Sequence, residues 1–241
     1  MAAELLAETG NAMSYEEYAM AAATLVKYDD ESRQTIGGVP ILERMHLGVF
    51  EEWAEIFGGD TESVEDSYGY SRFDALRGGL TYTNLFRGTS DGEEQINLHA
   101  KEFGDSLWYV SNYLACYGVT LEEAMREADY AFEFSRPYDG DMLERDVGRN
   151  IYPLELADFV DRGRNLFSHM GTLFARTQAS VPIDAGPKHI LKQLTRQYIE
   201  SMSVLAVATF DISLDDIMVA NLEKITGRWK NDTVLGHGDK R

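Results

Sequence analysis

Cysteine is almost absent from this 241-residue sequence, which contains only Cys116. A single thiol excludes an internal disulfide framework and a zinc cluster built from cysteines. The sequence also has no apolar run close to the roughly 18 residues that a membrane-spanning helix needs. Its first residues lack the basic segment that opens a secretory signal. We therefore expect a cytoplasmic, globular protein that has no membrane partner.

Basic residues are also scarce. Lysine and arginine total 22 against 41 aspartates and glutamates, which gives a formal net charge of −19. A field of that sign repels the phosphates of nucleic acids and anionic membranes, so we expect neither as a partner. If the substrate is nevertheless an anion, a cation must lie between it and the acidic residues. A bound metal ion is the simplest such cation.

Strand-like alternation of apolar and polar residues is nearly absent, whereas helical patterns cover most of the chain. Ser14 and Thr120 each precede a glutamate by three residues, Glu17 and Glu123, in the capping-box pattern of a helix start. The expected helices cover residues 15–28, 41–57, 93–117, 121–136, 154–177, 187–210 and 213–229. We therefore predict an all-α helix bundle.

Two segments interrupt the helical pattern. Residues 58–94 are rich in glycine, serine, aspartate and tyrosine, and they are long for a connection between helices. We interpret them as a surface loop or a lid. Residues 137–149 carry several acids and two glycines, which is typical of a linker. This linker divides the chain into an N-terminal helical part, residues 1–136, and a C-terminal helical part, residues 137–241.

A weak internal repeat connects the two parts. Residues 119–125 resemble residues 212–218, and both segments contain a hydroxyl cap with an acid three residues later. Capping boxes resemble one another in any case, so an insertion within one unit and a degenerate second copy both remain open. In a true repeat, Thr195 and Tyr198 stand where the first copy has carboxylates, and the second copy has lost their chemistry.

Two acidic clusters border the apolar faces of their helices. The first cluster is Glu51, Glu52 and Glu55, and the second is Glu102 and Asp105. Residues three apart share a helix face, so each cluster presents a pair: Glu52 with Glu55, and Glu102 with Asp105. Carboxylates gathered out of water repel one another and take up protons, and a hard divalent cation such as Mg²⁺ relieves that repulsion. The alternative is a solvated acidic face, because charged side chains are rarely buried.

The pattern Glu-Glu-x-x-Glu followed by Glu-x-x-Asp resembles the signature of the MazG-like, all-α nucleoside triphosphate pyrophosphohydrolases. The resemblance extends to the context, because residues 101–110 resemble the family's ligand helix and residues 117–123 its continuation. Residues 213–228 look like the family's closing helix, with Asn221, Lys224 and Arg228 in an Asn-x-x-Lys-x-x-x-Arg pattern. Three segments agree in order.

This resemblance implies hydrolysis of a (deoxy)nucleoside triphosphate to the monophosphate and pyrophosphate, with attack at the α-phosphorus, by a homo-oligomer. It implies Mg²⁺, with Mn²⁺ as a substitute. The implied metal ligands are Glu52, Glu55, Glu102 and Asp105. Glu51 would act as an outer ligand or a base, and the implied phosphate-binding residues are Asn221, Lys224 and Arg228.

Two other functions stay open at this point. The first is hydrolysis of a related nucleotide, such as dUTP, a modified nucleotide or an alarmone, because the phosphate chemistry is shared among these substrates. The second is a non-catalytic binding or regulatory module on the same fold, in which the long loops recruit a partner. Release of pyrophosphate by the purified protein separates the second function from the enzymatic ones.

Overall fold

The computed structural model describes residues 13–26, 28, 34–36, 38–56, 90–126, 152–210 and 212–230. The expected linker 137–149, the domain boundary at its start and most of the expected loop 58–94 lie outside these residues. The last residues of that loop, 90–94, are described, and they belong to a helix rather than to a loop.

The described residues are mostly helical, which confirms the all-α prediction for them. The helices are α2 (Tyr15–Thr24), α3 (Ile41–Ile56), α7 (Ser90–Cys116), α8 (Leu121–Arg126), α10 (Tyr152–Gln178), α11 (Ala185–Phe210) and α12 (Leu214–Lys230). A hairpin of two short antiparallel strands, β1 (Thr35–Ile36) and β2 (Val39–Pro40), precedes α3 and was not expected. Gly38 has a positive φ of 76° between the strands, a conformation that glycine adopts without strain.

The expected capping boxes are present. The Ser14 hydroxyl accepts a hydrogen bond from the Glu17 amide, and the Glu17 carboxylate accepts one from the Ser14 amide. Thr120 and Glu123 make the same reciprocal pair at the start of α8. Before that start, the Val119 amide bonds to the carbonyl of Leu114, and Gly118 has a φ of 67°. This is a Schellman motif, so the glycine ends α7 and the cap begins α8.

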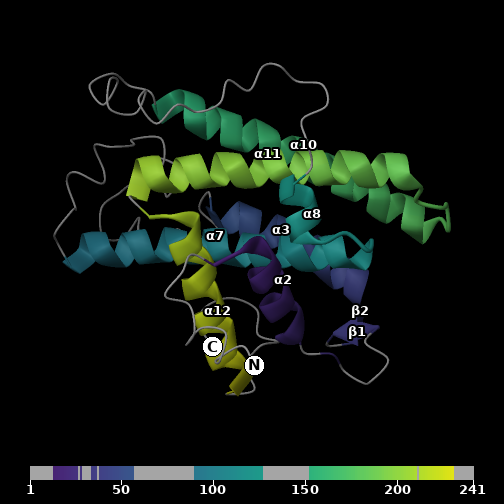
Figure 1. Ribbon diagram of the computed structural model, residues 1–241, viewed down its shortest axis with the longest axis horizontal. Helices are drawn as coiled ribbons and strands as arrows, with labels where there is room; N and C mark the ends of the chain where they lie inside the picture. Colours follow the sequence, from purple (N-terminus) through teal and green to yellow (C-terminus); the bar gives the residue numbers. More distant parts are fainter. Residues whose placement is uncertain are drawn as a thin grey trace.

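Helix α7 is the centre of the fold. It packs against α3, α12, α2 and α11, and α10 packs along α11. Figure 1 shows α10 and α11 side by side as an upper layer, with α7 running below them and with α12 and α2 below α7. Within the described part of the chain, no helix is long and apolar enough to cross a membrane.

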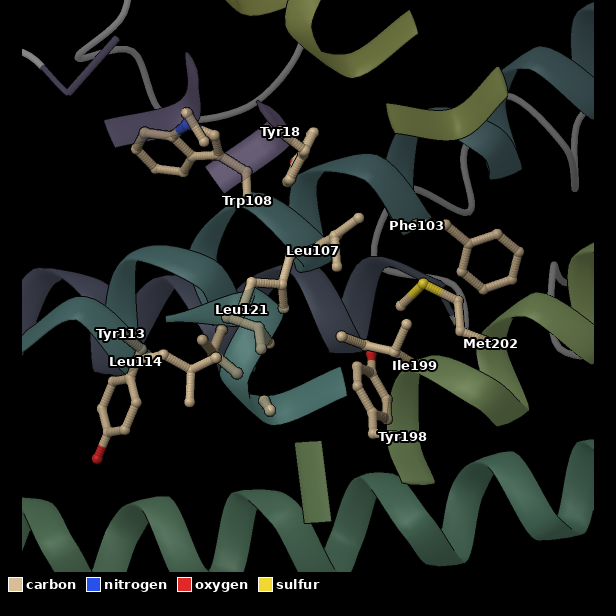
Figure 2. Packing of buried hydrophobic residues seen from close by; sticks show 14 of the residues in the cluster. Tyr18, Phe103, Leu107, Trp108, Tyr113, Leu114, Leu121, Tyr198, Ile199 and Met202 are labelled. Atoms are coloured by element: carbon tan, nitrogen blue, oxygen red, sulfur yellow. The ribbon is translucent and has the colours of Figure 1, made fainter. Parts of the chain in front are cut away.

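Side chains of α7 supply much of the core. Among its residues whose burial is described, from position 101 onward, the fully buried apolar ones are Phe103, Leu107, Val110, Tyr113 and Leu114. Figure 2 shows four of them, Phe103, Leu107, Tyr113 and Leu114, in the same cluster as Tyr198, Ile199 and Met202 of α11. Tyr198 is also fully buried, and its hydroxyl lies 2.8 Å from the Ser106 hydroxyl of α7. The residues in which the weak repeat lacks carboxylates, Thr195 and Tyr198, are therefore interior residues of the bundle.

Candidate metal centre

Three carboxylates from two helices converge beside the core. Glu52 comes from α3, and Glu102 and Asp105 come from α7. One carboxylate oxygen of each residue lies within 4.8 Å of those of the other two. A glycine permits the close approach of the two helices, because a Cβ atom at Gly48 of α3 would lie 2.1 Å from the ring of Tyr109 on α7.

Burial distinguishes this cluster from a solvated acidic face. Glu102 is 2% exposed and Asp105 is 8% exposed, while Glu52 is partly buried. Burial raises the pKa of the Glu52 carboxyl to about 9, and the charges of Asp105, Glu55 and Glu102 add to that rise, whereas Lys224 opposes it. In the metal-free protein, the carboxylate cluster therefore favours holding a proton at neutral pH. A divalent cation in the cluster would take that proton's place.

Helix α12 supplies two partners to Asp105. The Asn221 side-chain amide donates to Oδ1 of Asp105 at 2.8 Å, and the ammonium of Lys224 forms an ion pair with Oδ2. Asn221 itself is only 2% exposed. These two residues of the predicted closing helix therefore lie directly beside the carboxylate cluster, although 116 residues separate Asn221 from Asp105 along the chain.

The other predicted site residues lie around this cluster. Glu55 is not one of the three acids whose oxygens converge, but it is partly buried one turn away, and its charge acts on Glu52. Glu51 is exposed. Arg228 is partly buried and lies near enough to Lys101 of α7 to lower the pKa of that lysine. The assignment of these residues to metal or phosphate binding stays a prediction.

Two residues of the site were not predicted from the sequence. Lys101 directly precedes Glu102, and burial, together with the charge of Lys224, lowers the pKa of its ammonium. Tyr18 of α2 is fully buried and donates a hydrogen bond to Oδ1 of Asn221 at 2.8 Å. The sequence signals for Lys101 were its place beside an acid and its position at the start of the predicted ligand helix. The sequence contained no signal for Tyr18, since a tyrosine on an amphipathic helix is usually a core residue.

The donor set suits a hard cation. Among the described residues, the cluster offers carboxylate oxygens and includes neither histidine nor cysteine. Oxygen ligands are those that Mg²⁺ prefers, and Mn²⁺ accepts the same ligands. Two of the three acids are buried, so the cation would relieve repulsion that water cannot screen there. The three carboxylates therefore fit Mg²⁺ better than a thiolate- or imidazole-seeking metal.

Comparison with known proteins identifies no relative of this chain. No family model matches the chain, and neither the curated proteins nor the solved structures contain a significant match to it.

Proposed function

We propose that this protein is a Mg²⁺-dependent nucleoside triphosphate pyrophosphohydrolase that converts a (deoxy)nucleoside triphosphate to its monophosphate and pyrophosphate. The observation that supports this proposal best is the position of α12. Its Asn221 and Lys224 contact the same buried carboxylate, Asp105, that joins Glu52 and Glu102. The resemblance to MazG-like enzymes assigns metal and phosphate binding to these two sets of residues.

In this proposal the acidic residues of the site bind the metal, and its basic residues bind the phosphates. Glu52, Glu102 and Asp105 would hold Mg²⁺, with Glu55 one turn away on α3. When bound, the metal would polarise the phosphates and lower the pKa of a water molecule. Attack of a water oxygen on the α-phosphorus breaks the anhydride bond to the β-phosphorus, and pyrophosphate leaves. The attacking water loses its proton to a base, a role that Glu51 would fill from the exposed side of α3.

Cations on α7 and α12 would receive the phosphate oxygens that the metal does not contact. The charges of Lys224 and Arg228 both act on Lys101 beside the cluster, in a molecule whose net charge is −19. Charged donors of this kind bind phosphate oxygens more strongly than neutral ones. They would therefore counteract the repulsion between the acidic protein and a triphosphate.

The test is a pyrophosphate-release assay on the purified protein with each common NTP and dNTP, dUTP included. We expect Mg²⁺ to support turnover of at least one of them, Mn²⁺ to substitute, and EDTA to abolish turnover. Glu102→Gln should lose at least about 100-fold in kcat/KM, since a buried metal ligand is removed. Glu16→Gln, at an exposed acid on α2, is the matched control and should keep wild-type activity.

Two results would contradict the proposal in different ways. Equal turnover in EDTA would refute the metal-dependent mechanism. Absence of turnover with every nucleotide would favour the binding or regulatory module, for which the cluster would then serve as a structural metal site.

A further inference from the structure

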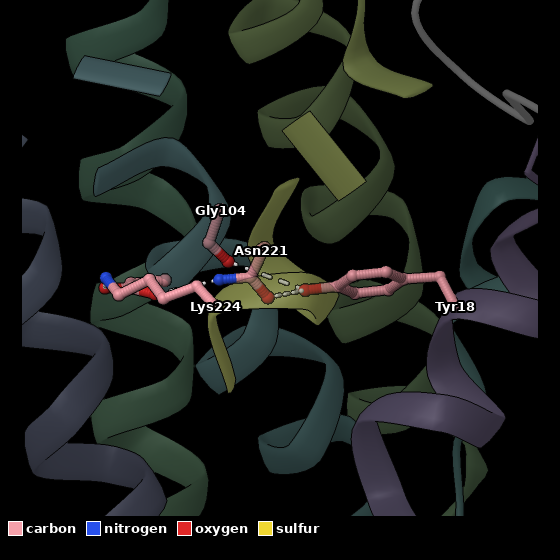
Figure 3. A network of polar contacts seen from close by, with 5 residues as sticks. Tyr18, Gly104, Asn221 and Lys224 are labelled. Carbon is pink, nitrogen blue, oxygen red and sulfur yellow. Dashed lines mark hydrogen bonds and ion pairs between the residues drawn. The ribbon is translucent and has the colours of Figure 1, made fainter. Parts of the chain in front are cut away.

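A buried hydrogen-bond chain leads from helix α2 to the carboxylate cluster. The Tyr18 hydroxyl donates to Oδ1 of Asn221 at 2.8 Å, and it also lies 3.5 Å from the carbonyl oxygen of Gly104. The amide nitrogen of Asn221 then donates to Oδ1 of Asp105. Figure 3 shows Tyr18 and Asn221 pointing toward each other from α2 and α12. These hydrogen bonds therefore connect α2, α12 and α7.

The chemistry of the groups gives this chain a direction. An ionised carboxylate only accepts hydrogen bonds, so Asn221 must turn its nitrogen, and not its oxygen, toward Asp105. That orientation leaves the amide oxygen facing Tyr18, where a donor is required because Asn221 is buried. The tyrosine hydroxyl is that donor. Without it, the amide loses the contact that opposes its rotation.

We infer that Tyr18 is a positioning residue for the metal centre, which orients the Asn221 amide and through it the Asp105 carboxylate. The inference deepens the proposed function and rests on it for the purpose of the site. Asp105 has to direct an oxygen toward Glu52 and Glu102, and the hydrogen bond from Asn221 to its Oδ1 restricts rotation of the carboxylate. Groups that orient metal ligands in this way typically change metal affinity about 10- to 100-fold when they are removed.

A purely structural role for Tyr18 makes a different prediction. Its ring lies in the core, and loss of its hydroxyl would then affect stability alone. Tyr113 provides the matched control, because it is also fully buried and its hydroxyl donates to the carbonyl of Met170 at 2.7 Å, away from the carboxylates. Tyr18→Phe and Tyr113→Phe each remove one buried hydroxyl and keep the ring.

The experiment is a Mn²⁺ titration of the full chain without nucleotide, followed by electron paramagnetic resonance or calorimetry. We expect Tyr18→Phe to raise the Kd for Mn²⁺ by about 10-fold or more, and Tyr113→Phe to stay within about twofold of wild type. With nucleotide present, Tyr18→Phe should need more Mg²⁺ for half-maximal turnover and should recover near wild-type kcat at saturating Mg²⁺. Circular dichroism and urea unfolding of both variants establish that each remains folded.

A double-mutant cycle tests whether Tyr18 acts through Asn221. Asn221→Ala should itself weaken Mn²⁺ binding, and adding Tyr18→Phe to it should have no further effect on the Kd. Additive effects would overturn the inference, as would equal Mn²⁺ affinity of wild type and Tyr18→Phe, or no Mn²⁺ binding by the wild type.

The outcome for Tyr18 is separable from that for the enzyme. If the wild type binds Mn²⁺, Tyr18→Phe weakens it and no nucleotide is hydrolysed, the positioning role stands and the proposed function fails. If nucleotides are hydrolysed and the wild type and Tyr18→Phe bind Mn²⁺ with equal affinity, the proposed function stands and the positioning role fails.

Discussion

At the scale of single residues, the acids of the cluster differ in their partners. Asp105 forms an ion pair with the ammonium of Lys224 and accepts a hydrogen bond from the amide of Asn221, both on α12. Burial and the acidic neighbours of Glu52 instead raise the pKa of its carboxyl. Neutralising Asp105 in the metal-free protein would leave Lys224 partly buried without its carboxylate partner. The repulsion among the acids is therefore tested better at Glu52.

Glu52 should make the stability of the metal-free protein depend on pH. Its pKa rises from an ordinary 4.5 to about 9 in the folded state, so between these values the folded chain holds a proton that the unfolded chain has released. The contribution of Glu52 to stability is then largest below about pH 4.5 and falls toward pH 9, by up to about 1.4 kcal/mol per pH unit for one proton. Glu52→Gln should reduce the slope of the free energy of unfolding against pH. Urea unfolding in EDTA at pH 6, 7, 8 and 9 measures this slope.

The control for this prediction is Glu16→Gln, which changes an exposed carboxylate and should keep the wild-type slope. Equal slopes for wild type and Glu52→Gln would show that Glu52 is ionised and solvated in the folded protein.

At the scale of elements, the site depends on how closely helices approach α7. Gly104 lies between the two acids of α7, opposite α12, and a Cβ atom there would lie 2.7 Å from Cβ of Asn221. This contact is closer than two carbon atoms tolerate, so the missing side chain is what allows α12 to bring Asn221 to Asp105. A helical glycine therefore has a packing role here and not a conformational one.

Gly104→Ala should displace α12 from α7 and weaken both stability and metal binding. Overpacking of this kind typically costs about 1–3 kcal/mol, and the Kd for Mn²⁺ should rise because Asn221 moves from Asp105. Gly227→Ala is the matched control on α12, since no atom lies within 4 Å of its added Cβ. It should stabilise the protein by up to about 1 kcal/mol through helix propensity. Urea unfolding and Mn²⁺ titration of both variants test these two expectations. Unchanged Mn²⁺ binding in Gly104→Ala would contradict the packing role of Gly104 at the metal centre.

At the scale of the whole molecule, a net charge of −19 means that any cation stabilises the fold to some extent by screening. A specific Mg²⁺ site adds a term that depends on its ligands. At about 100 times its Kd, Mg²⁺ should stabilise the wild type by about 2.7 kcal/mol through linkage. For a chain of this size, that corresponds to a rise in Tm of roughly 5–10 °C.

Melting curves with Mg²⁺ and with Na⁺ at equal ionic strength separate the specific term from screening. Glu102→Gln should lose most of the Mg²⁺-dependent rise, and Glu16→Gln should retain it. If all three proteins show the same rise, the acids of the cluster act only as general negative charge.

Local interactions explain what could be predicted from the sequence. Capping boxes, a C-terminal glycine and apolar periodicity involve residues within a few positions of one another, so they located the helix ends that the structure describes to within a few residues. The expected end of helix 121–136 lies outside the described residues. The same locality paired Glu102 with Asp105 on one face of α7. The sequence pattern could not predict the hairpin before α3, because two-residue strands have almost no periodic signal.

By itself, the sequence determined an all-α chain, its strong acidity and the candidate acids, since these depend on composition and on spacing along a helix. Only the tertiary structure decided which acids converge, because the approach of α3 to α7 brings together carboxylate oxygens of Glu52, Glu102 and Asp105, a group that does not include Glu55. The same packing introduced Tyr18, which lies 203 residues from Asn221 in the chain. Contacts across such distances depend on shape and burial, and no periodic pattern in the sequence records them.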